Sequence, residues 1–339
     1  MTASPTEPIE REDVSAGPGE ARSGDPLEVP PEGEGGFTQS WFPVCYSHDV
    51  APGAVIGREF LDGRIVVMRT RAGEARVLSA YCAHLGVDLM HGAVHDDALR
   101  CPFHRWEYGT DGRCLRTGIG DPPPPRARLF AFPTEERYGV VFAFNGERPG
   151  WLLPDLHIAV EEAVAYPAPV MRIHCDPWTM MANTPDWQHF LLLHGFQFDV
   201  EHARASMQWS DNGFRYTMRT RVDDMDFEFT PTLAGTSVFF VHGWFGRRRF
   251  ALVAPFGLPR PGQCDIYTSV VLPRDDPDPP QILGVLQERF GRMVQEDYPL
   301  IDTAHFRPRN LTRADEHLAR WIRFVRDYPR AHPARDALR

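Results

Sequence analysis

The chain has 339 residues, of which 42% are hydrophobic and 24% are charged, and its formal net charge is -10 at pH 7. This length suits two domains that each bury their own core. An acidic chain without a basic stripe is a poor candidate for binding nucleic acid, and six cysteines are too few for a disulfide scaffold.

Residues 1–36 form an acidic segment rich in proline and glycine. They include nine acidic residues, two arginines and only isolated apolar residues. Such a segment cannot bury enough surface to offset the entropy lost on ordering, so we expect a disordered acidic tail. The N-terminus has no signal-peptide pattern, and the longest uncharged run, Phe229 to Gly246, is broken by polar residues, proline and glycine. We therefore expect a cytoplasmic protein that does not bind a membrane.

Residues 37–150 are expected to form an all-β domain. Strand-length apolar runs, as in residues 63–81 and 138–150, are separated by glycine and aspartate turns. Residues 151–339 differ, because helical stretches near 176–194, 280–305 and 313–327 alternate with strand-like runs. This second half predicts an α+β domain with antiparallel strands and helices packed on one side.

Two cysteine–histidine pairs lie in loops of the first domain. Cys82-Ala-His84 is followed, after sixteen residues, by Cys101-Pro-Phe-His104. Two thiolates and two imidazoles can bind a structural zinc ion, or a [2Fe–2S] cluster with histidines on one iron. The spacing C-x-H in place of C-x-x-C weakens the zinc interpretation. Four unrelated buried residues are the remaining alternative.

A second motif, Asp186-x-x-His189-x-x-x-x-His194-Gly195, lies in the second domain. Asp186 and His189 share a helix face. His189 and His194 are about 140° apart around an ideal helix, so they can bind one metal ion only if the helix loosens or ends near His194. Gly195 permits such an ending. Two core histidines near a helix end are the alternative.

One carboxylate falls on the apolar stripe of the predicted helix at 280–305. Asp297 lies on this stripe, whereas Glu296 and Asp302 fall on polar faces. A buried carboxylate is costly unless it is paired or bound to a metal ion. Asp297 is therefore the acid that needs a partner, which can be a metal ion or an arginine. The stripe consists of Leu286, Phe290, Met293, Leu300, Ile301 and Ala304.

The two motifs together resemble the Rieske non-heme iron oxygenases, over about residues 40–305. The resemblance implies that Cys82 and Cys101 bind one iron of a [2Fe–2S] cluster and that His84 and His104 bind the other. Pro102, Trp106 and Gly109 also match the second cluster loop of that family. Leu85 and Arg105 depart from it, since many members have arginine and glycine at these places.

The same resemblance implies that His189, His194 and Asp297 bind a mononuclear Fe(II) and that Asp186 carries electrons toward it. Two histidines and one carboxylate leave open positions for O₂. Asp186 lies one turn before His189, so we expect it to accept a hydrogen bond from the free ring nitrogen of that ligand.

The expected architecture is an N-terminal Rieske domain at 37–150 and a helix-grip catalytic domain at 151–339, in a homotrimer of oxygenase subunits. Such an enzyme would use O₂ to hydroxylate, demethylate, desaturate or dihydroxylate an apolar molecule that is steroid-like, terpenoid or aromatic. No G-x-G-x-x-G follows a strand, so electrons must come from a separate ferredoxin or flavin reductase.

Two questions remain open at the level of sequence. The first is whether the second domain only binds ligands, in a Rieske electron-transfer protein without a working mononuclear iron. The second is which aromatic residues line a substrate pocket, because alternating strand residues are as often core. The candidates are Phe227, Phe239, Phe240, Trp244, Phe245 and Phe250.

Overall fold

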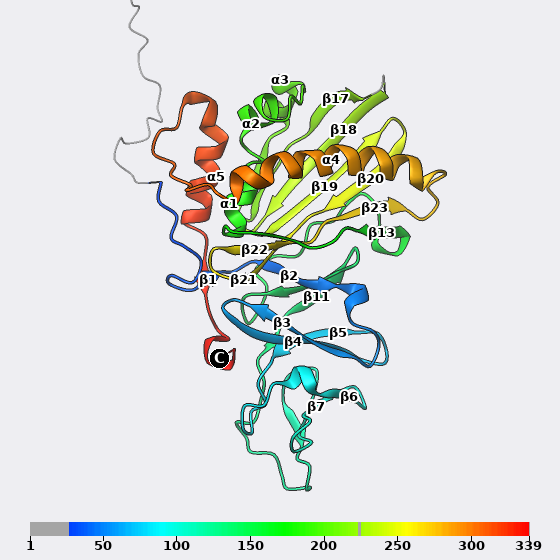
Figure 1. The fold of residues 1–339 in the computed structure, drawn as a ribbon, viewed down its shortest axis with the longest axis vertical. Helices are drawn as coiled ribbons and strands as arrows, with labels where there is room; N and C mark the ends of the chain where they lie inside the picture. Colours follow the sequence, from blue (N-terminus) through cyan, green and yellow to red (C-terminus); the bar gives the residue numbers. More distant parts are fainter. Residues whose placement is uncertain (1–26, 223–224, 339) are drawn as a thin grey trace, which may run out of the picture.

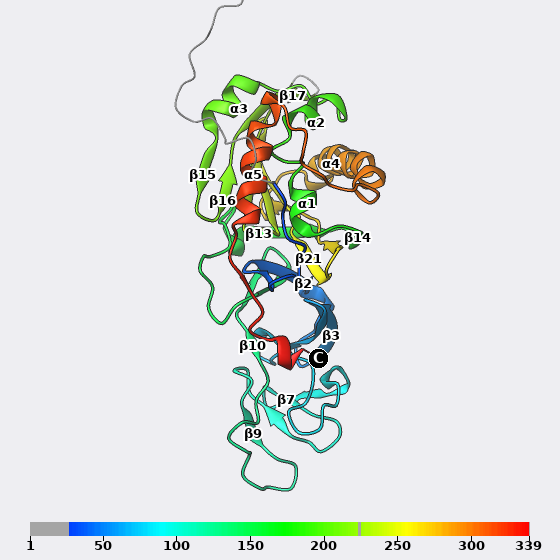
Figure 2. The same cartoon turned by 90° about the vertical axis from the view of Figure 1, so that its left-hand side faces the viewer.

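Two β-rich domains are stacked along the long axis of the molecule (Figures 1 and 2). The computed structural model describes residues 27–222 and 225–338. Within these residues, no helix has both the length and the apolar composition needed to cross a membrane.

In the described residues 37–150, most strands of the N-terminal domain form three antiparallel sheets. One sheet has the strand order β10 (Ala131–Phe132), β5 (Ala75–Ser79), β4 (Gly63–Arg69), β3 (Val55–Phe60). A second has the order β11 (Thr134–Arg137), β12 (Val140–Phe144), β2 (Trp41–Tyr46). The third has the order β6 (Ala93–His95), β7 (Ala98–Arg100), β8 (Glu107–Tyr108), β9 (Cys114–Arg116) and forms the lower tip in Figure 1.

Strand β4 connects the main core of this domain to the tip. Successive side chains of a strand point to opposite faces. Ile65 and Val67 are therefore buried in the main core, whereas Val66 and Met68 are buried against Leu89 and other residues below. Both faces of β4 are covered, which explains its nearly continuous apolar sequence and fixes the tip to the rest of the domain.

The C-terminal domain is built on an antiparallel sheet of eight strands. Its order is β13 (Ala163–Pro167), β23 (Ser269–Pro273), β20 (Arg248–Val253), β19 (Val238–Phe245), β18 (Met225–Ala234), β16 (Gly213–Arg215), β15 (Gln208–Ser210), and β17 (Met218–Val222) also pairs with β18. A smaller sheet has the order β14 (Met171–Ile173), β22 (Gln263–Ile266), β21 (Phe256–Arg260).

Five α-helices lie in the described part of this domain, and the longest crosses one face of the large sheet (Figure 1). They are α1 (Pro177–Met181), α2 (Trp187–Leu192), α3 (Val200–Ser206), α4 (Pro279–Ile301) and α5 (Glu316–Arg326). The helical stretch predicted at 176–194 is thus two short helices. Pro185 disfavours a helical conformation of Thr184, and Asp186 caps the start of α2.

The face of the large sheet opposite α4 packs against the first domain. Phe240 of β19 contacts the rings of Tyr138 and Phe142, at centroid distances of 6.2 and 6.3 Å. Its neighbours Phe239 and Val241 point to the other face, toward α4. The sheet is therefore buried on both faces in this region.

Two of the expected domain boundaries need correction, although residues 1–26 lie outside the described part of the chain. Order begins before Phe37, because Glu32 is buried and its carboxylate accepts hydrogen bonds from the N–H and the hydroxyl of Thr38, at 3.0 and 2.7 Å. The C-terminal residues leave the second domain. Strand β24 (Arg330–Ala331) pairs with β1 (Phe37–Thr38), and Leu338 is buried in the core of the first domain.

Candidate metal centres

Two loops with matching backbone geometry carry the four predicted cluster ligands. The N–H of Gly86 donates to the carbonyl of Cys82 at 2.8 Å, and the N–H of Arg105 donates to that of Cys101 at 3.1 Å. Both donors have positive φ angles, +74° for Gly86 and +56° for Arg105. A residue other than glycine pays about 1–2 kcal/mol for this conformation. Arg105 stands where many Rieske proteins have glycine, so this chain keeps the shape of the loop at a local energetic cost.

The four side chains divide into a buried thiol pair and an exposed imidazole pair. Cys82 and Cys101 are buried. His84 and His104 are exposed, with their Nδ1 atoms 3.1 Å apart. Within the described residues, these four do not form a group whose donor atoms all lie within 4.8 Å, as ligands of one zinc ion would. The separation fits a cluster with thiolates on one iron and imidazoles on the other.

Neighbouring aromatic residues hold both loops. The hydroxyl of Tyr108 lies 3.1 Å from Sγ of Cys82 and accepts a hydrogen bond of 3.1 Å from the N–H of Ala83. The ring of Trp106 stacks on His84 at a centroid distance of 4.4 Å. Burial raises the pKa of the Cys101 thiol, so binding of iron must displace its proton.

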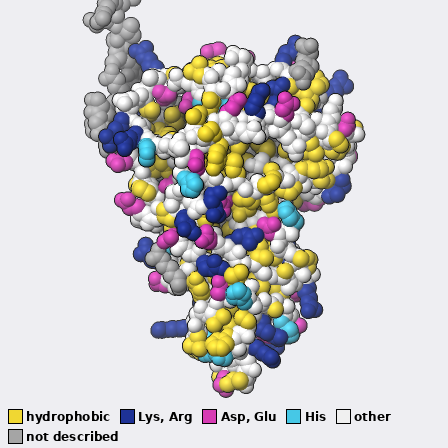
Figure 3. All heavy atoms as spheres, viewed as in Figure 1, with side chains coloured by type: hydrophobic (Ala, Val, Ile, Leu, Met, Phe, Trp, Pro, Cys, Tyr) yellow, Lys and Arg dark blue, Asp and Glu magenta, His cyan; other side chains and the backbone are white. Residues whose placement is uncertain are grey.

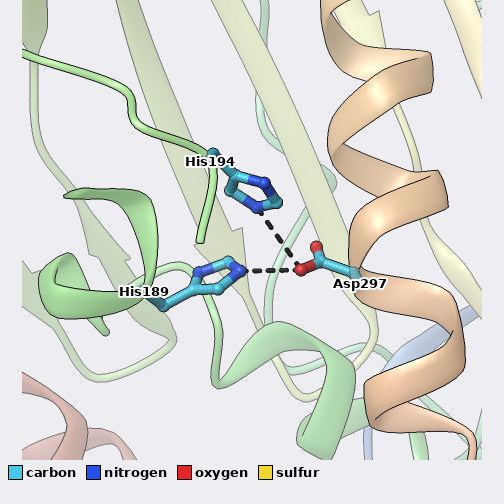
Figure 4. Close-up of side chains that lie close together, drawn as sticks. All are labelled: His189, His194 and Asp297. Atoms are coloured by element: carbon cyan, nitrogen blue, oxygen red, sulfur yellow. Dashed lines mark hydrogen bonds and ion pairs between the residues drawn. The ribbon is translucent and has the colours of Figure 1, made fainter. Parts of the chain in front are cut away.

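The second candidate centre joins α2, the turn after it and α4 (Figure 4). Nε2 of His189 lies 2.7 Å from Oδ1 of Asp297, and Nε2 of His194 lies 3.3 Å from the same oxygen. These three donor atoms lie within 4.8 Å of one another. The side chains of His189, His194 and Asp297 are only 12%, 2% and 9% exposed. The site is therefore nearly closed to bulk water.

Local structure explains why both histidines face Asp297. The carboxylate of Asp186 caps α2 by accepting a hydrogen bond of 3.1 Å from the N–H of His189. The helix ends at Leu192, and Gly195 adopts a φ of +59°. The helix thus ends near His194, as binding of one metal ion by both histidines requires. The turn after α2 brings His194 next to His189.

The donor set fits a mononuclear iron. Within the described residues, His194 Nε2, which faces Asp297, is buried without a hydrogen-bond partner. Buried polar atoms are rarely left unpaired, and each one calls for an explanation. Two imidazoles and one carboxylate that meet at one point form the facial set that binds Fe(II) and leaves positions open.

Comparison with known proteins identifies the domain that carries the first candidate site and the fold of the chain. Residues 40–126 match the family model of the Rieske [2Fe-2S] domain. The structure superposes on a variant of NdmA from Pseudomonas putida CBB5 with theobromine, with a TM-score of 0.68 at 19% identity over 85% of this chain and 89% of that one. Dicamba monooxygenase bound to dicamba gives a TM-score of 0.67 at 17% identity over 85% and 96%. The chain contains a Rieske domain and has the Rieske oxygenase fold.

Two curated proteins are similar in sequence to about half of this chain. Cholesterol 7-desaturase nvd of Xenopus laevis is 32% identical over 173 residues, which cover 49% of this chain and 37% of that protein. The oxygenase component of 3-ketosteroid-9-alpha-monooxygenase from Rhodococcus rhodochrous is 28% identical over 174 residues, which cover 47% and 43%. The aligned residues therefore span less than half of either relative.

Asp186 lies beside the catalytic-domain site in a different arrangement from the one expected. Its carboxylate binds the backbone N–H of His189, and the ring nitrogen Nδ1 of His189 is not paired with it. Burial raises the pKa of Asp186, with the His189 N–H acting in the opposite direction. The capping role was not expected from the resemblance, although aspartate before a helix is a common cap.

Two residues at this site were missed in the sequence analysis. Oε2 of Glu296 lies 2.7 Å from Nδ1 of His194, although its place on a polar helix face suggested no role. Asn183 lines the cavity described below, and its buried Nδ2 has no partner within the described residues. Asn183 could have been identified as a site residue because it lies three residues before Asp186 in the motif. No feature of the sequence near Glu296 indicated a contact with His194.

An apolar cavity of about 500 Å³ lies between α4 and the large sheet, and His189 and Asp297 form part of its wall. Figure 3 shows hydrophobic side chains gathered on the face that α4 crosses. Asp297 is the only charged side chain among the described residues of the lining. The aromatic lining residues are Tyr166, Phe190, Phe229, Phe239, Phe256 and Phe290.

Of the six aromatic residues considered for this lining, only Phe239 is part of it. Strand alternation sends Phe240 to the interface with the first domain and leaves Trp244 41% exposed. The other three lie in the hydrophobic core beside the cavity, namely Phe227, Phe245 and Phe250. They have the same phase along their strands as the lining residues Phe229, Val241 and Leu252, so their position along the strands, not their phase, keeps them out of the lining.

Proposed function

We propose that the protein is a Rieske non-heme iron oxygenase that uses O₂ to hydroxylate, demethylate or desaturate an uncharged apolar molecule of steroid-like, terpenoid or aromatic type. The observation that carries this proposal is the convergence of His189, His194 and Asp297 at the wall of an apolar cavity. A chain that only relayed electrons would not need an open metal site against such a cavity. The names of the relatives, a steroid desaturase and a steroid monooxygenase, support the same class of substrate.

Each site residue has a role that its position supports. Cys82, Cys101, His84 and His104 would hold the cluster, and His189, His194 and Asp297 would hold the mononuclear iron. When bound, the cluster supplies single electrons and the iron activates O₂. The apolar lining excludes water and binds the substrate by burial of its surface. Asn183, with its unpaired Nδ2, is placed to donate a hydrogen bond to an oxygen atom beside the iron ligands.

A head-to-tail homotrimer would supply the electron path between the two sites. Figure 1 shows α2 and the β6–β9 tip at opposite ends of one chain, so the cluster of one chain cannot serve its own catalytic site directly. Both ends expose apolar side chains around their ligands. Phe103 beside His104 is 60% exposed, and Leu192 near His189 is 81% exposed. Exposed apolar surface of this kind is typical of contact with another chain.

The electron donor would be a separate ferredoxin or flavin reductase, and the enzyme would act in the cytoplasm. The exposed histidine pair supports docking of such a carrier at the tip. Figure 3 shows hydrophobic and histidine side chains together at that end of the molecule.

The proposed function is tested by counting metal ions and products in the same preparation. Protein purified without oxygen damage should contain three irons and two acid-labile sulfides per chain. With a surrogate reductase, O₂ and a panel of steroids, terpenoids and methoxyarenes, mass spectrometry should detect a product whose mass differs by one oxygen, one methylene or two hydrogens. Two irons per chain and no product would instead favour the electron-transfer protein.

Cys101→Ala is expected to remove the cluster. The change deletes one of two thiolates on one iron, which leaves that iron under-coordinated. The red-brown colour and the acid-labile sulfide should be lost, as measured by visible absorbance and sulfide assay. Cys45→Ala is the matched control, because Cys45 is also buried in the first domain but lies in β2, away from the cluster loops. Colourless wild-type protein that contains one zinc ion would contradict the prediction.

Gly291→Leu is expected to narrow the cavity. Gly291 lines the cavity from α4, and a Cβ atom there would meet no atom within 4 Å. The backbone therefore has room for a side chain here, and a leucine that projects into the cavity should weaken binding of a four-ring steroid about tenfold while a single-ring methoxyarene is still bound. Isothermal titration with both ligands measures the effect.

The second glycine of α4 provides the control for this prediction. Gly284 has equally open surroundings but is absent from the cavity lining. Gly284→Ala and Gly291→Ala should each stabilise the helix by roughly 0.5–1 kcal/mol. Gly284→Leu should leave the affinity for both ligands unchanged. Equal affinity losses in Gly284→Leu and Gly291→Leu would show that the cavity size is not the cause.

A further inference from the structure

One ring nitrogen of His194 faces away from Asp297 and contacts a carboxylate, that of Glu296. The proposed function gives this carboxylate no role. Nδ1 of His194 lies 2.7 Å from Oε2 of Glu296, while Nε2 of the same ring lies 3.3 Å from Oδ1 of Asp297. A carboxylate can only accept a hydrogen bond, so Nδ1 must carry the hydrogen. In a neutral imidazole this leaves the lone pair of Nε2 directed toward the Asp297 side.

Glu296 and Asp297 reach the same ring because they are neighbours on α4. Consecutive residues of an α-helix are about 100° apart around its axis, so their side chains reach His194 from two sides. The His194 side chain is 2% exposed and that of Glu296 is 34% exposed. Little water can reach the ring to replace this contact. The other oxygen of Glu296 lies 3.9 Å from Nε of Arg292, one turn earlier.

His189 and His194 differ in whether their Nδ1 atom has a hydrogen-bond partner. Within the described residues, His189 Nδ1 has no hydrogen-bond partner, whereas His194 Nδ1 has Glu296. Glu296 is also absent from the cavity lining, so it does not contact a bound substrate there. The contact of Glu296 with the proposed metal centre is therefore made through the ring of His194.

We propose that Glu296 is a positioning residue that holds His194 in the tautomer and orientation that binds the metal ion. The inference rests on the proposed iron site. Carboxylates behind metal-bound histidines fix the ring and increase its basicity, and their loss typically reduces metal affinity about 10–100-fold. Glu296 supports His194 in this way, and it directly precedes Asp297, the third proposed ligand, in the sequence.

The test measures binding of Co²⁺ alone to metal-depleted protein, so it does not depend on turnover. Glu296→Ala should weaken Co²⁺ binding about 10–100-fold and change the visible absorption bands of the bound ion. Glu296→Gln keeps an acceptor for Nδ1–H, so it should retain the wild-type spectrum and lose less affinity than Glu296→Ala. Glu296→Met, which keeps the side-chain length and the helix propensity, repeats the test in case alanine destabilises α4.

Two controls separate support of His194 from general effects of charge. Glu288 is an exposed glutamate on the same helix, so Glu288→Ala removes a similar charge at a distance from His194. Arg292→Ala removes the other partner of Glu296. Both should bind Co²⁺ within about twofold of wild type. The melting temperature of each variant without metal shows whether the fold is intact.

Three results would overturn the proposal. They are wild-type affinity in Glu296→Ala and Glu296→Met, equal affinity losses in Glu296→Gln and Glu296→Ala, and an equal loss in Glu288→Ala. His189→Ala and Asp297→Ala test the underlying site and should abolish binding. If they bind Co²⁺ as the wild type does, the iron site itself is wrong. If they lose binding and the Glu296 variants do not, only the role of Glu296 is wrong.

Discussion

Asp297→Ala is expected to remove the mononuclear iron and reduce turnover below detection, while the Rieske absorbance stays unchanged. Asp297 is the only anionic donor in the described group of three, so its loss leaves two neutral imidazoles. The cluster loops lie in the other domain and do not contact α4. Iron analysis should fall from three to two irons per chain, and the visible spectrum should match that of the wild type.

Glu288→Ala is the control for this variant, since Glu288 is an exposed acid on the same helix. It should retain three irons and full turnover. Three irons and normal turnover in Asp297→Ala would show that the carboxylate has another partner, and the proposed catalytic site would then be wrong. Loss of the Rieske colour in Asp297→Ala would point to a general defect in folding.

Asp186→Asn is expected to slow reoxidation of the reduced cluster by O₂ and substrate by orders of magnitude, with both metal centres and the trimer retained. Asparagine caps a helix about as well as aspartate, so α2 and His189 should stay in place. The amide loses the negative charge and one acceptor of Asp186, the residue that the resemblance places on the electron path toward the mononuclear iron. Stopped-flow absorbance of the reduced cluster measures the rate.

Asp186→Ala should be at least as slow, but it also loses the cap, which costs about 1 kcal/mol. The structure offers a matched control for both changes. Asp199 caps α3 through the N–H of His202 at 2.9 Å, in the same D-x-x-H spacing as Asp186 and His189. Asp199→Asn should leave the reoxidation rate unchanged. Unchanged rates in the Asp186 variants with full metal loading would remove Asp186 from the electron path.

Local spacing was sufficient to locate most of the candidate site residues. A five-residue gap between His189 and His194, followed by Gly195, required a helix end, and α2 ends at Leu192. Helical periodicity placed Asp297 on a buried stripe, and it is 7% exposed. These predictions depended only on the regular geometry of a helix, which is the same in every fold. The D-x-x-H spacing alone was not specific, because the second copy at Asp199 only caps a helix.

Tertiary structure decided the features that depend on contacts between distant parts of the chain. Glu296 and His194 are 102 residues apart in sequence, and periodicity could place Glu296 only relative to its own helix. The sequence left open which aromatic side chains of the strands line a pocket, and the packing of α4 and of the first domain decided which of them face the cavity. Likewise, the docking of Leu338 into the first domain depends on a surface formed by residues more than 200 positions earlier, such as Gly63. The amino-acid sequence thus predicted the candidate ligands and the helix end beside them, whereas the fold determined the contacts that support these residues, because those contacts exist only once separate elements pack together.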